Sequence, residues 1–486
     1  METATPIKRR LFYLCCAVFI IANALLISQE FYYFSFLPLL LFIGYWLFFS
    51  LDKFILLIAF TTPFSVKLED FDINVGVSIP TEPLMFAVLL LFVIKVLYDY
   101  NFLERRILKH PISIAVLLNL LWLFITSITS EYPIVSFKFL TARLWFVVTF
   151  FFFGVLLFKD VHNIKRFVWV YCISLSVVIL YNTINHSFYG FERQVGTWIV
   201  HPFFNDHTAY GSVIALFVPF MLTFIFHREN KFSIKMLSLG LLLVLLTGIL
   251  LSYSRAAWVS LVGALGVFLI LRLRISFRYV FAFIALLSGL FFIYRTEIMM
   301  ELEKNKQDSS GKYTEHIRSI SNISTDASNL ERINRWASAI RMFKDRPVFG
   351  WGPGTYQLVY APFQYSKEKT LISTNAGDMG NAHSEYIGPL SESGVLGMLT
   401  VLFIVISVFV TGVKVYKRAK SGEIRILSLA ALLGLCTYYI HGVMNNFLDT
   451  DKASVPFWAL TAMILVLDVY HKDNEEGEYG KGEIIK

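Results

Sequence analysis

The chain has 486 residues, of which 56% are hydrophobic and 16% aromatic, and its mean hydropathy is +0.61. These values exclude an ordinary soluble domain and indicate a polytopic membrane protein. The formal net charge of +8 does not indicate nucleic-acid binding, because the basic residues gather in short segments between apolar runs, as the positive-inside rule describes. The four cysteines lie within apolar runs and have no metal-ligand spacing, so no disulfide framework or metal site is expected.

Apolar runs long enough to cross a bilayer recur along most of the chain. We predict an all-α protein with about 12 to 14 transmembrane helices. The first run follows three basic residues, as in a signal peptide, but lacks a small-residue cleavage site and is interpreted as a retained span. The predicted spans are 11–28, 31–50, 53–64, 82–98, 111–129, 136–158, 165–185, 208–227, 235–253, 256–272, 278–294, 384–414, 424–446 and 453–471.

Five basic segments between the spans fall on one side of this topology, which assigns them and both termini to the cytoplasm. The long loop 295–382 then faces the opposite side. Its part 301–328 is polar and is expected to be mobile, whereas a capping box at 328–331 predicts an amphipathic helix that ends before Pro347. The expected organisation is N-terminal helices 1–200, central helices 201–294, a periplasmic loop 295–382, C-terminal helices 383–471 and a cytoplasmic tail 472–486.

Three arginines on the side opposite the cytoplasm are candidates for an anion-binding site. Arg255 lies between two apolar runs, where an arginine is costly without an anionic partner. Arg332 and Arg335 are three residues apart on the predicted loop helix and share one face. Guanidinium groups suit phosphate because their planar fork makes two parallel hydrogen bonds. A snorkelling Arg255 and a solvated helix face are the alternatives, but a histidine on the same side, His383, favours an anion site.

Weaker candidates lie on the same predicted side. Asp206 either orients the neighbouring His207 or caps a helix. Arg143 adds positive potential near the start of the span at 136–158, and Glu385 follows the histidine at the boundary of the loop. The acidic residues Glu69, Asp70 and Asp72 could hold a divalent cation, although a solvated acidic loop is the favoured interpretation because no spacing makes the carboxylates converge.

The chain resembles the bacterial O-antigen ligase and polymerase superfamily of integral-membrane glycosyltransferases. The segment at 254–258 is similar to that family's Ser-Arg-Gly-Ala sequence, with Ala256 in place of the glycine, and 206–211 is similar to a segment of some members. Arg332 is followed by Trp336, Pro347 and the glycine-rich sequence 350–356. His383-Ser384, nine residues and Gly394-Val395-Leu396-Gly397 match the ligase histidine pattern.

This resemblance implies a helical fold of the GT-C type. It also implies transfer of a glycan from undecaprenyl diphosphate to an acceptor hydroxyl of lipid A–core on the periplasmic face of the inner membrane, with no cofactor and no metal ion. By position, Arg255 and Arg332 correspond to essential arginines of the family and His383 to its essential histidine; Arg335, His207, Asp206, Arg143 and Glu385 are weaker substrate-binding candidates.

Three alternatives stay open. A polymerase joins lipid-linked repeat units and shares the arginine signatures, although the histidine pattern leans towards ligase. A transporter or flippase of lipid-linked glycan would use the same arginines for binding, but no internal repeat supports it. A metal-dependent enzyme would use the acidic residues at 69–72. The role of His383 is equally open, because an imidazole can deprotonate the acceptor or bind phosphate as imidazolium.

Overall fold

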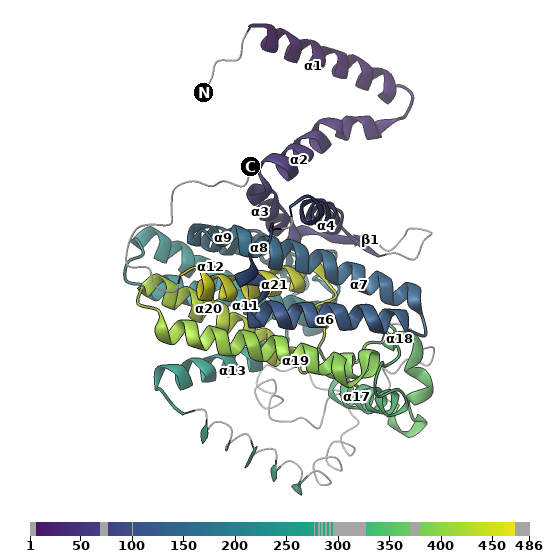
Figure 1. Cartoon of the computed structure of the whole chain (residues 1–486), viewed down its shortest axis with the longest axis vertical. Coiled ribbons are helices and arrows are strands. Elements are labelled where there is room, and N and C mark those ends of the chain that lie inside the picture. Colours follow the sequence, from purple (N-terminus) through teal and green to yellow (C-terminus); the bar gives the residue numbers. More distant parts are fainter. Residues whose placement is uncertain are drawn as a thin grey trace. The chain divides into compact units, whose positions relative to one another are not determined.

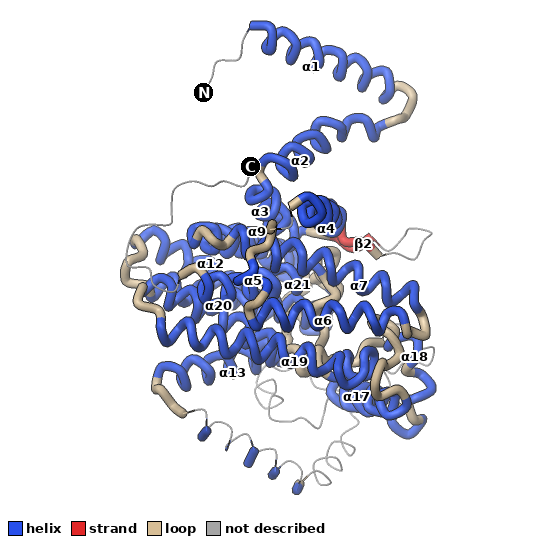
Figure 2. The backbone as a smooth tube through the Cα atoms, in the orientation of Figure 1, coloured by secondary structure: helices blue, strands red, loops and turns tan. Residues whose placement is uncertain are grey.

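The computed structural model describes residues 6–68, 76–99, 101–276, 327–369 and 380–471, with isolated residues between 278 and 294. The chain divides into two units, residues 1–57 with 481–486, and residues 58–480. Within the described residues, twelve helices are long and apolar enough to cross a membrane, which confirms the predicted all-α polytopic class. Figure 2 shows helices joined by short loops and one small two-stranded sheet.

The described elements divide at the long loop. Before it come α1 (Pro6–Ile27), η1 (Tyr32–Phe36), α2 (Leu37–Phe49), α3 (Leu51–Thr61), η2 (Thr62–Phe64), β1 (Val66–Leu68), β2 (Val77–Ile79), α4 (Thr81–Tyr98), α5 (Arg105–Leu108), α6 (Pro111–Ile128), α7 (Pro133–Val147), η3 (Val148–Phe152), α8 (Phe153–Leu157), α9 (Val161–Ser187), α10 (Arg193–Trp198), α11 (His207–Phe226), α12 (Phe232–Leu251) and α13 (Arg255–Arg272). After it come α17 (Ala327–Asp345), α18 (Tyr356–Val359), η5 (Ala361–Phe363), η6 (Ser366–Glu368), α19 (Ile387–Arg418), α20 (Gly422–His441) and α21 (Asp451–Val469).

Twelve of the fourteen predicted spans coincide with these long helices. The span predicted at 53–64 is wrong: it forms α3, which has 11 residues and a rise of about 16 Å, too short for a hydrocarbon core of about 30 Å. About half of the span predicted at 278–294, and nearly all of the segment 301–328 expected to be mobile, lie outside the described residues. The predicted loop helix is confirmed as α17, which ends before Pro347.

In the first unit, α1 and α2 bury none of the residues in their apolar stretches. In the second unit, α21 is the central helix, because 94% of its apolar stretch is buried and it contacts α20, α19 and α11. Helices α11 and α20 pack against each other and are 78% buried, whereas α12 and α13 are 28% and 22% buried and lie at the periphery. The apolar faces of the peripheral helices are therefore left for lipid.

A kink in α19 fixes the position of the loop helix α17, which lies beside one end of α19 (Figure 1). Gly394 has a φ of +69°, so the helix is interrupted there and backbone carbonyls are released from the helical pattern. The carbonyls of Ser391 and Glu392 accept hydrogen bonds from the backbone N–H groups of Trp351 and Gly352, at 3.2 and 2.7 Å. The glycine-rich segment 349–356 therefore replaces the missing helical partners and docks on α19.

Gly394 is required because its backbone lies against the chain that leaves α17. A Cβ atom at this position would be 2.0 Å from the carbonyl oxygen of Val348, and a positive φ is strained for any residue with a side chain. The carboxylate of Glu392 adds a further link, because its Oε1 accepts from the N–H of Tyr356 at 3.0 Å. The kink and the glycine-rich segment thus hold the loop helix at one end of the bundle.

We predict that Gly394→Ala lowers the melting temperature of the detergent-solubilised protein and exposes the 346–356 segment to limited proteolysis. Strain of this kind typically costs about 1–3 kcal/mol, and the clash with a backbone carbonyl adds to it. Gly388→Ala is the matched control on the same helix, because its Cβ would lie 3.8 Å from the nearest atom, Ala382 Cβ. Equal melting temperatures for the two variants would contradict this account.

Candidate functional site

The turn between α12 and α13 presents Arg255 as the first residue of α13. Its N-cap is Ser254, whose Oγ accepts from the N–H of Ala257 at 3.4 Å. Tyr253 takes a left-handed φ of +49°, and its hydroxyl donates to the carbonyl of Phe191 at 2.7 Å. The turn is therefore locked both to its own helix and to the segment between α9 and α10, which places Arg255 at the end of the bundle where α11 begins.

Asp206 caps a helix, as one of the two sequence-based alternatives predicted, and also lies beside His207. As the N-cap of α11, its Oδ1 accepts from the N–H of Thr208 at 2.7 Å and its Oδ2 accepts from the Thr208 hydroxyl at 2.9 Å. The same Oδ1 lies 3.3 Å from His207 Nδ1. Gly211, one turn further on, packs against the side chains of Ser252 and Ser254, so the start of α11 lies beside the turn that carries Arg255.

The two arginines of α17 have different environments. Arg335 is buried, its Nε donates to Glu331 Oε1 at 2.9 Å, and its guanidinium lies over the Tyr360 ring at 5.6 Å from the centroid. Arg335 therefore holds α17 to its own loop. Arg332 is on the side of the helix nearer the bundle: its charge interacts with Asp206, His207 and Arg255. Burial lowers the pKa of the Arg332 guanidinium, and the Asp206 carboxylate opposes that shift.

His383 occupies a strained position between α17 and α20. Its φ is +46°, unfavourable for a residue with a side chain, and its N–H donates to Asn381 Oδ1 at 3.0 Å. Two residues on, the N–H of Glu385 donates to the carbonyl of Gly442 at 2.8 Å. Burial, followed by the charges of Arg335 and Arg332, lowers the pKa of the His383 imidazole to about 4, so the ring is neutral at pH 7.

These side chains form one electrostatic group, which we name the arginine–histidine cluster. Its members are Arg193, Asp206, His207, Arg255, Arg332, His383 and His441. The charge of Arg332 or Asp206 reaches the other members except Arg193, which interacts with His207 and Arg255. Because three arginines face a single carboxylate within this group, its net charge is positive even with every histidine neutral. A partly buried group of this kind is suited to an anion that makes several charge-assisted hydrogen bonds.

Sequence reasoning missed two members of the cluster. Arg193 begins α10, between the predicted spans 165–185 and 208–227, and the order of the spans places this segment on the same side as Arg255. A basic residue on the side opposite the cytoplasm is an exception to the positive-inside rule, and this exception could have identified Arg193 as a candidate. His441 was hidden because it fell inside the span predicted at 424–446, whereas α20 ends at His441 itself.

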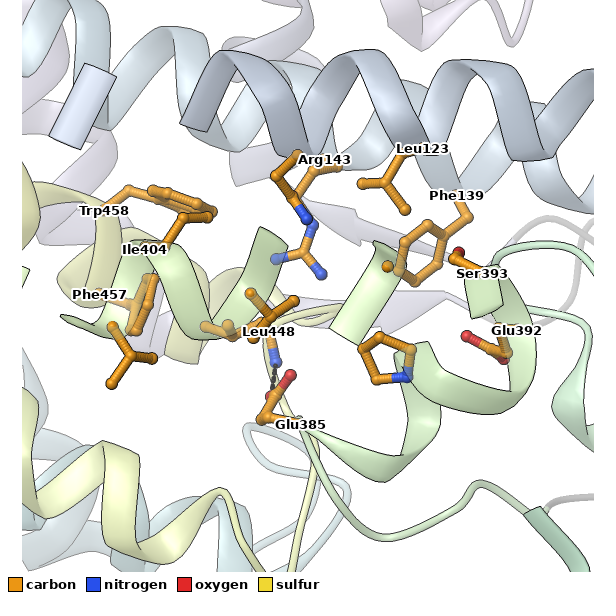
Figure 3. Close-up of a pocket in the computed structure, with 15 residues that line it drawn as sticks. Leu123, Phe139, Arg143, Glu385, Glu392, Ser393, Ile404, Leu448, Phe457 and Trp458 are labelled. Atoms are coloured by element: carbon orange, nitrogen blue, oxygen red, sulfur yellow. Dashed lines mark hydrogen bonds between the residues drawn. The ribbon is translucent and has the colours of Figure 1, made fainter. Parts of the chain in front are cut away.

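Two weaker candidates, Arg143 and Glu385, line a cavity whose walls include no member of the cluster. Figure 3 shows Arg143 extending from α7 towards Glu385 and Leu448, with Phe457 and Trp458 on one side. The cavity volume is about 60 Å³, and a water needs about 10–15 Å³ on this measure, so it has room for a few waters.

Glu385 itself anchors the α20–α21 loop: its Oε1 accepts from the Tyr438 hydroxyl and from the N–H groups of Phe447 and Leu448. The candidate acidic group Glu69, Asp70 and Asp72 lies outside the described residues. A metal site there stays a prediction.

The fold and this cluster define a multi-pass α-helical membrane protein with a basic, histidine-containing site at one end of its bundle. The protein family described as O-Antigen ligase matches residues 240–402, a stretch that contains Arg255, Arg332 and His383. The match covers about a third of the chain; it supports membership of the O-antigen ligase superfamily and an enzyme of the glycosyltransferase or ligase type. No curated protein matches the chain.

Proposed function

We propose that the chain transfers a glycan from undecaprenyl diphosphate to a hydroxyl group of lipid A–core on the periplasmic face of the bacterial inner membrane. One observation carries this proposal: Arg255, Arg332 and His383, separated by up to 128 residues in the sequence (383 − 255), converge in one partly buried positive cluster. A lipid diphosphate is an anion that reaches the membrane surface while its polyprenyl chain stays in the bilayer, and the cluster lies at one end of a membrane bundle.

The reaction follows from charge. As the bond between the sugar C1 and the diphosphate oxygen breaks, negative charge develops on the leaving diphosphate. The guanidiniums of Arg255 and Arg332 are fixed before the reaction and stabilise that charge, which is the kind of electrostatic preorganisation that lowers activation barriers most. The acceptor oxygen forms the new bond to C1, and its proton passes to the neutral His383 ring. A single displacement of this kind inverts the anomeric carbon.

The lowered pKa of His383 supports the general-base role over phosphate binding as imidazolium. A base must be unprotonated to act, and this ring is already neutral over the physiological range. The strained backbone at His383 supports a functional position for this residue, although not one role over the other, because strain of this kind gathers at active sites and ligand-binding sites alike.

A reconstituted transfer assay tests the proposal. Proteoliposomes that contain the purified chain, undecaprenyl-diphosphate glycan and lipid A–core should form ligated product at the same rate with and without a chelator. Product formed only when a second lipid-linked repeat unit is the acceptor would identify a polymerase. Movement of the lipid-linked glycan across the bilayer without transfer would identify a transporter, and chelator-sensitive transfer would assign catalysis to the acidic residues at 69–72.

A further inference from the structure

His441, the last residue of α20, has a polar atom that the fold leaves unsatisfied. The side chain is 1% exposed, and its ring packs against Phe447, with 5.8 Å between centroids. Nδ1 lies 3.5 Å from Asn445 Nδ2, whereas Nε2 is buried and has no hydrogen-bond partner among the residues that the structure describes. A buried polar atom without a partner is costly, and in native proteins it calls for an explanation such as a ligand.

The same ring borders the arginine–histidine cluster from the bundle side. The segment that carries His383 runs against the end of α20: Glu385 N–H donates to the Gly442 carbonyl, and the Tyr386 hydroxyl donates to the Tyr439 carbonyl at 2.9 Å. The charges of Arg332 and Asp206 both reach His441. The unsatisfied nitrogen therefore belongs to a ring at the edge of a positively charged site.

The side chain of Asn445 determines which nitrogen of the His441 ring carries the proton. Asn445 Nδ2 carries two hydrogens and no lone pair for a hydrogen bond, so its contact with Nδ1 requires that Nδ1 accepts. In a neutral imidazole whose Nδ1 accepts, Nε2 carries the proton. His441 therefore presents an N–H donor that lacks an acceptor in the described protein, and the missing partner must be an acceptor.

We propose that His441 is a phosphate-binding residue whose Nε2–H donates to an oxygen of the diphosphate group held by the cluster. This inference rests on the proposed function for its ligand. The arginines attract the diphosphate through their positive charge. The neutral, buried imidazole adds a hydrogen-bond donor of fixed direction, which favours one orientation of the bound diphosphate. A metal cation is a poor alternative occupant, because the neighbouring arginines make the cluster positive.

The test compares two variants of similar shape that differ in one donor. His441→Gln keeps an N–H group, whereas His441→Met fills the same space without one. Affinity is measured by displacement of a fluorescent short-chain polyprenyl diphosphate from the full-length protein in detergent, with size-exclusion profiles to confirm folding. We expect the methionine variant to bind about 10- to 100-fold more weakly than wild type, as for loss of a hydrogen bond to a charged group, and the glutamine variant to bind severalfold more tightly than the methionine variant.

Equal affinities for wild type and both variants would overturn the inference while leaving the proposed function in place. If wild type itself does not bind the diphosphate lipid, the proposed function and the inference both fail.

Inorganic pyrophosphate is the second probe: if it shows the same order of affinities, the residue contacts the phosphates themselves, as proposed. If the two substitutions weaken the binding of a neutral polyprenyl alcohol but not the binding of pyrophosphate, His441 has only a packing role and the inference is overturned. Arg341→Ala, on the remote face of α17 where Arg341 is paired with Glu368, serves as a folding control that should leave binding unchanged.

Discussion

Replacing Arg332 by alanine should lower the rate of glycan transfer by about 100- to 1,000-fold, the typical cost of removing one preorganised donor to a developing anion. Arg332 is the member of the cluster whose charge reaches Asp206, His207, Arg255, His383 and His441, so its loss affects the whole site. Arg332→Lys should recover little of this activity, because an ammonium is a point charge and cannot reproduce the two parallel hydrogen bonds of a guanidinium.

The measurement is initial-rate transfer by purified variants in proteoliposomes. Arg341→Ala is the matched control, since Arg341 lies on the same helix but donates to Glu368 at 3.1 Å and to the Phe363 carbonyl. That variant should lose stability rather than turnover. Wild-type turnover by a folded Arg332→Ala protein would remove Arg332 from the mechanism.

Arg255 offers an internal check on this account. Its charge interacts with that of Arg332, and if the two guanidiniums act on one anion, as proposed, their effects should not be additive. We therefore expect the Arg255→Ala, Arg332→Ala double variant to lose less activity than the product of the two single losses. Multiplicative losses would mean that the two arginines act on separate steps or separate groups.

The sequence was sufficient for the architecture because membrane spans depend mainly on local composition. A run of apolar residues is visible without any knowledge of its neighbours, and twelve helices of the described chain lie where such runs predict them. The prediction at 53–64 was wrong for a reason that composition does not show: α3 ends at Thr61, and Pro63 in the following turn removes a backbone donor.

The site was less accessible from sequence because its meaning depends on partners that are distant along the chain. Arg332 and Arg335 lie three residues apart on one helix, and only the resemblance to the family ranked Arg332 above Arg335. In the structure, Arg335 pairs with Glu331 and lies over Tyr360, whereas the charge of Arg332 interacts with Asp206 in the cluster. Gly394 appeared in the sequence only as part of the histidine pattern, but the group that requires a glycine there is the backbone at Val348, which no local pattern identifies.

The pH dependence of transfer should report the environment of His383. Burial and the charges of Arg335 and Arg332 lower its pKa from 6.5 to about 4. As a base it is therefore active above this value, and the acid limb of kcat/KM should lie near pH 4 instead of near 6.5. The unfolded chain takes up this proton at about pH 6.5 and the folded chain does not, so His383 also destabilises the fold progressively as pH falls from 6.5 towards 4.

Arg332→Gln removes one of the charges that lower this pKa. In the residual activity of that variant, the acid limb should therefore move upward, towards 6.5, while burial and Arg335 keep it below that value. An acid limb that stays in place would show that Arg332 does not act on the titrating group, or that the titrating group is not His383.

His383→Gln then separates the two possible roles of the ring. Glutamine can donate a hydrogen bond to phosphate but cannot accept a proton at neutral pH, so loss of a general base predicts a fall in kcat of about 100- to 10,000-fold. Binding of the diphosphate lipid should change little, because Arg255, Arg332 and His441 are unaltered. Near-wild-type kcat in this variant would leave His383 as a phosphate ligand and require another acceptor for the proton. The cluster then offers His207, the imidazole that Asp206 already contacts at 3.3 Å.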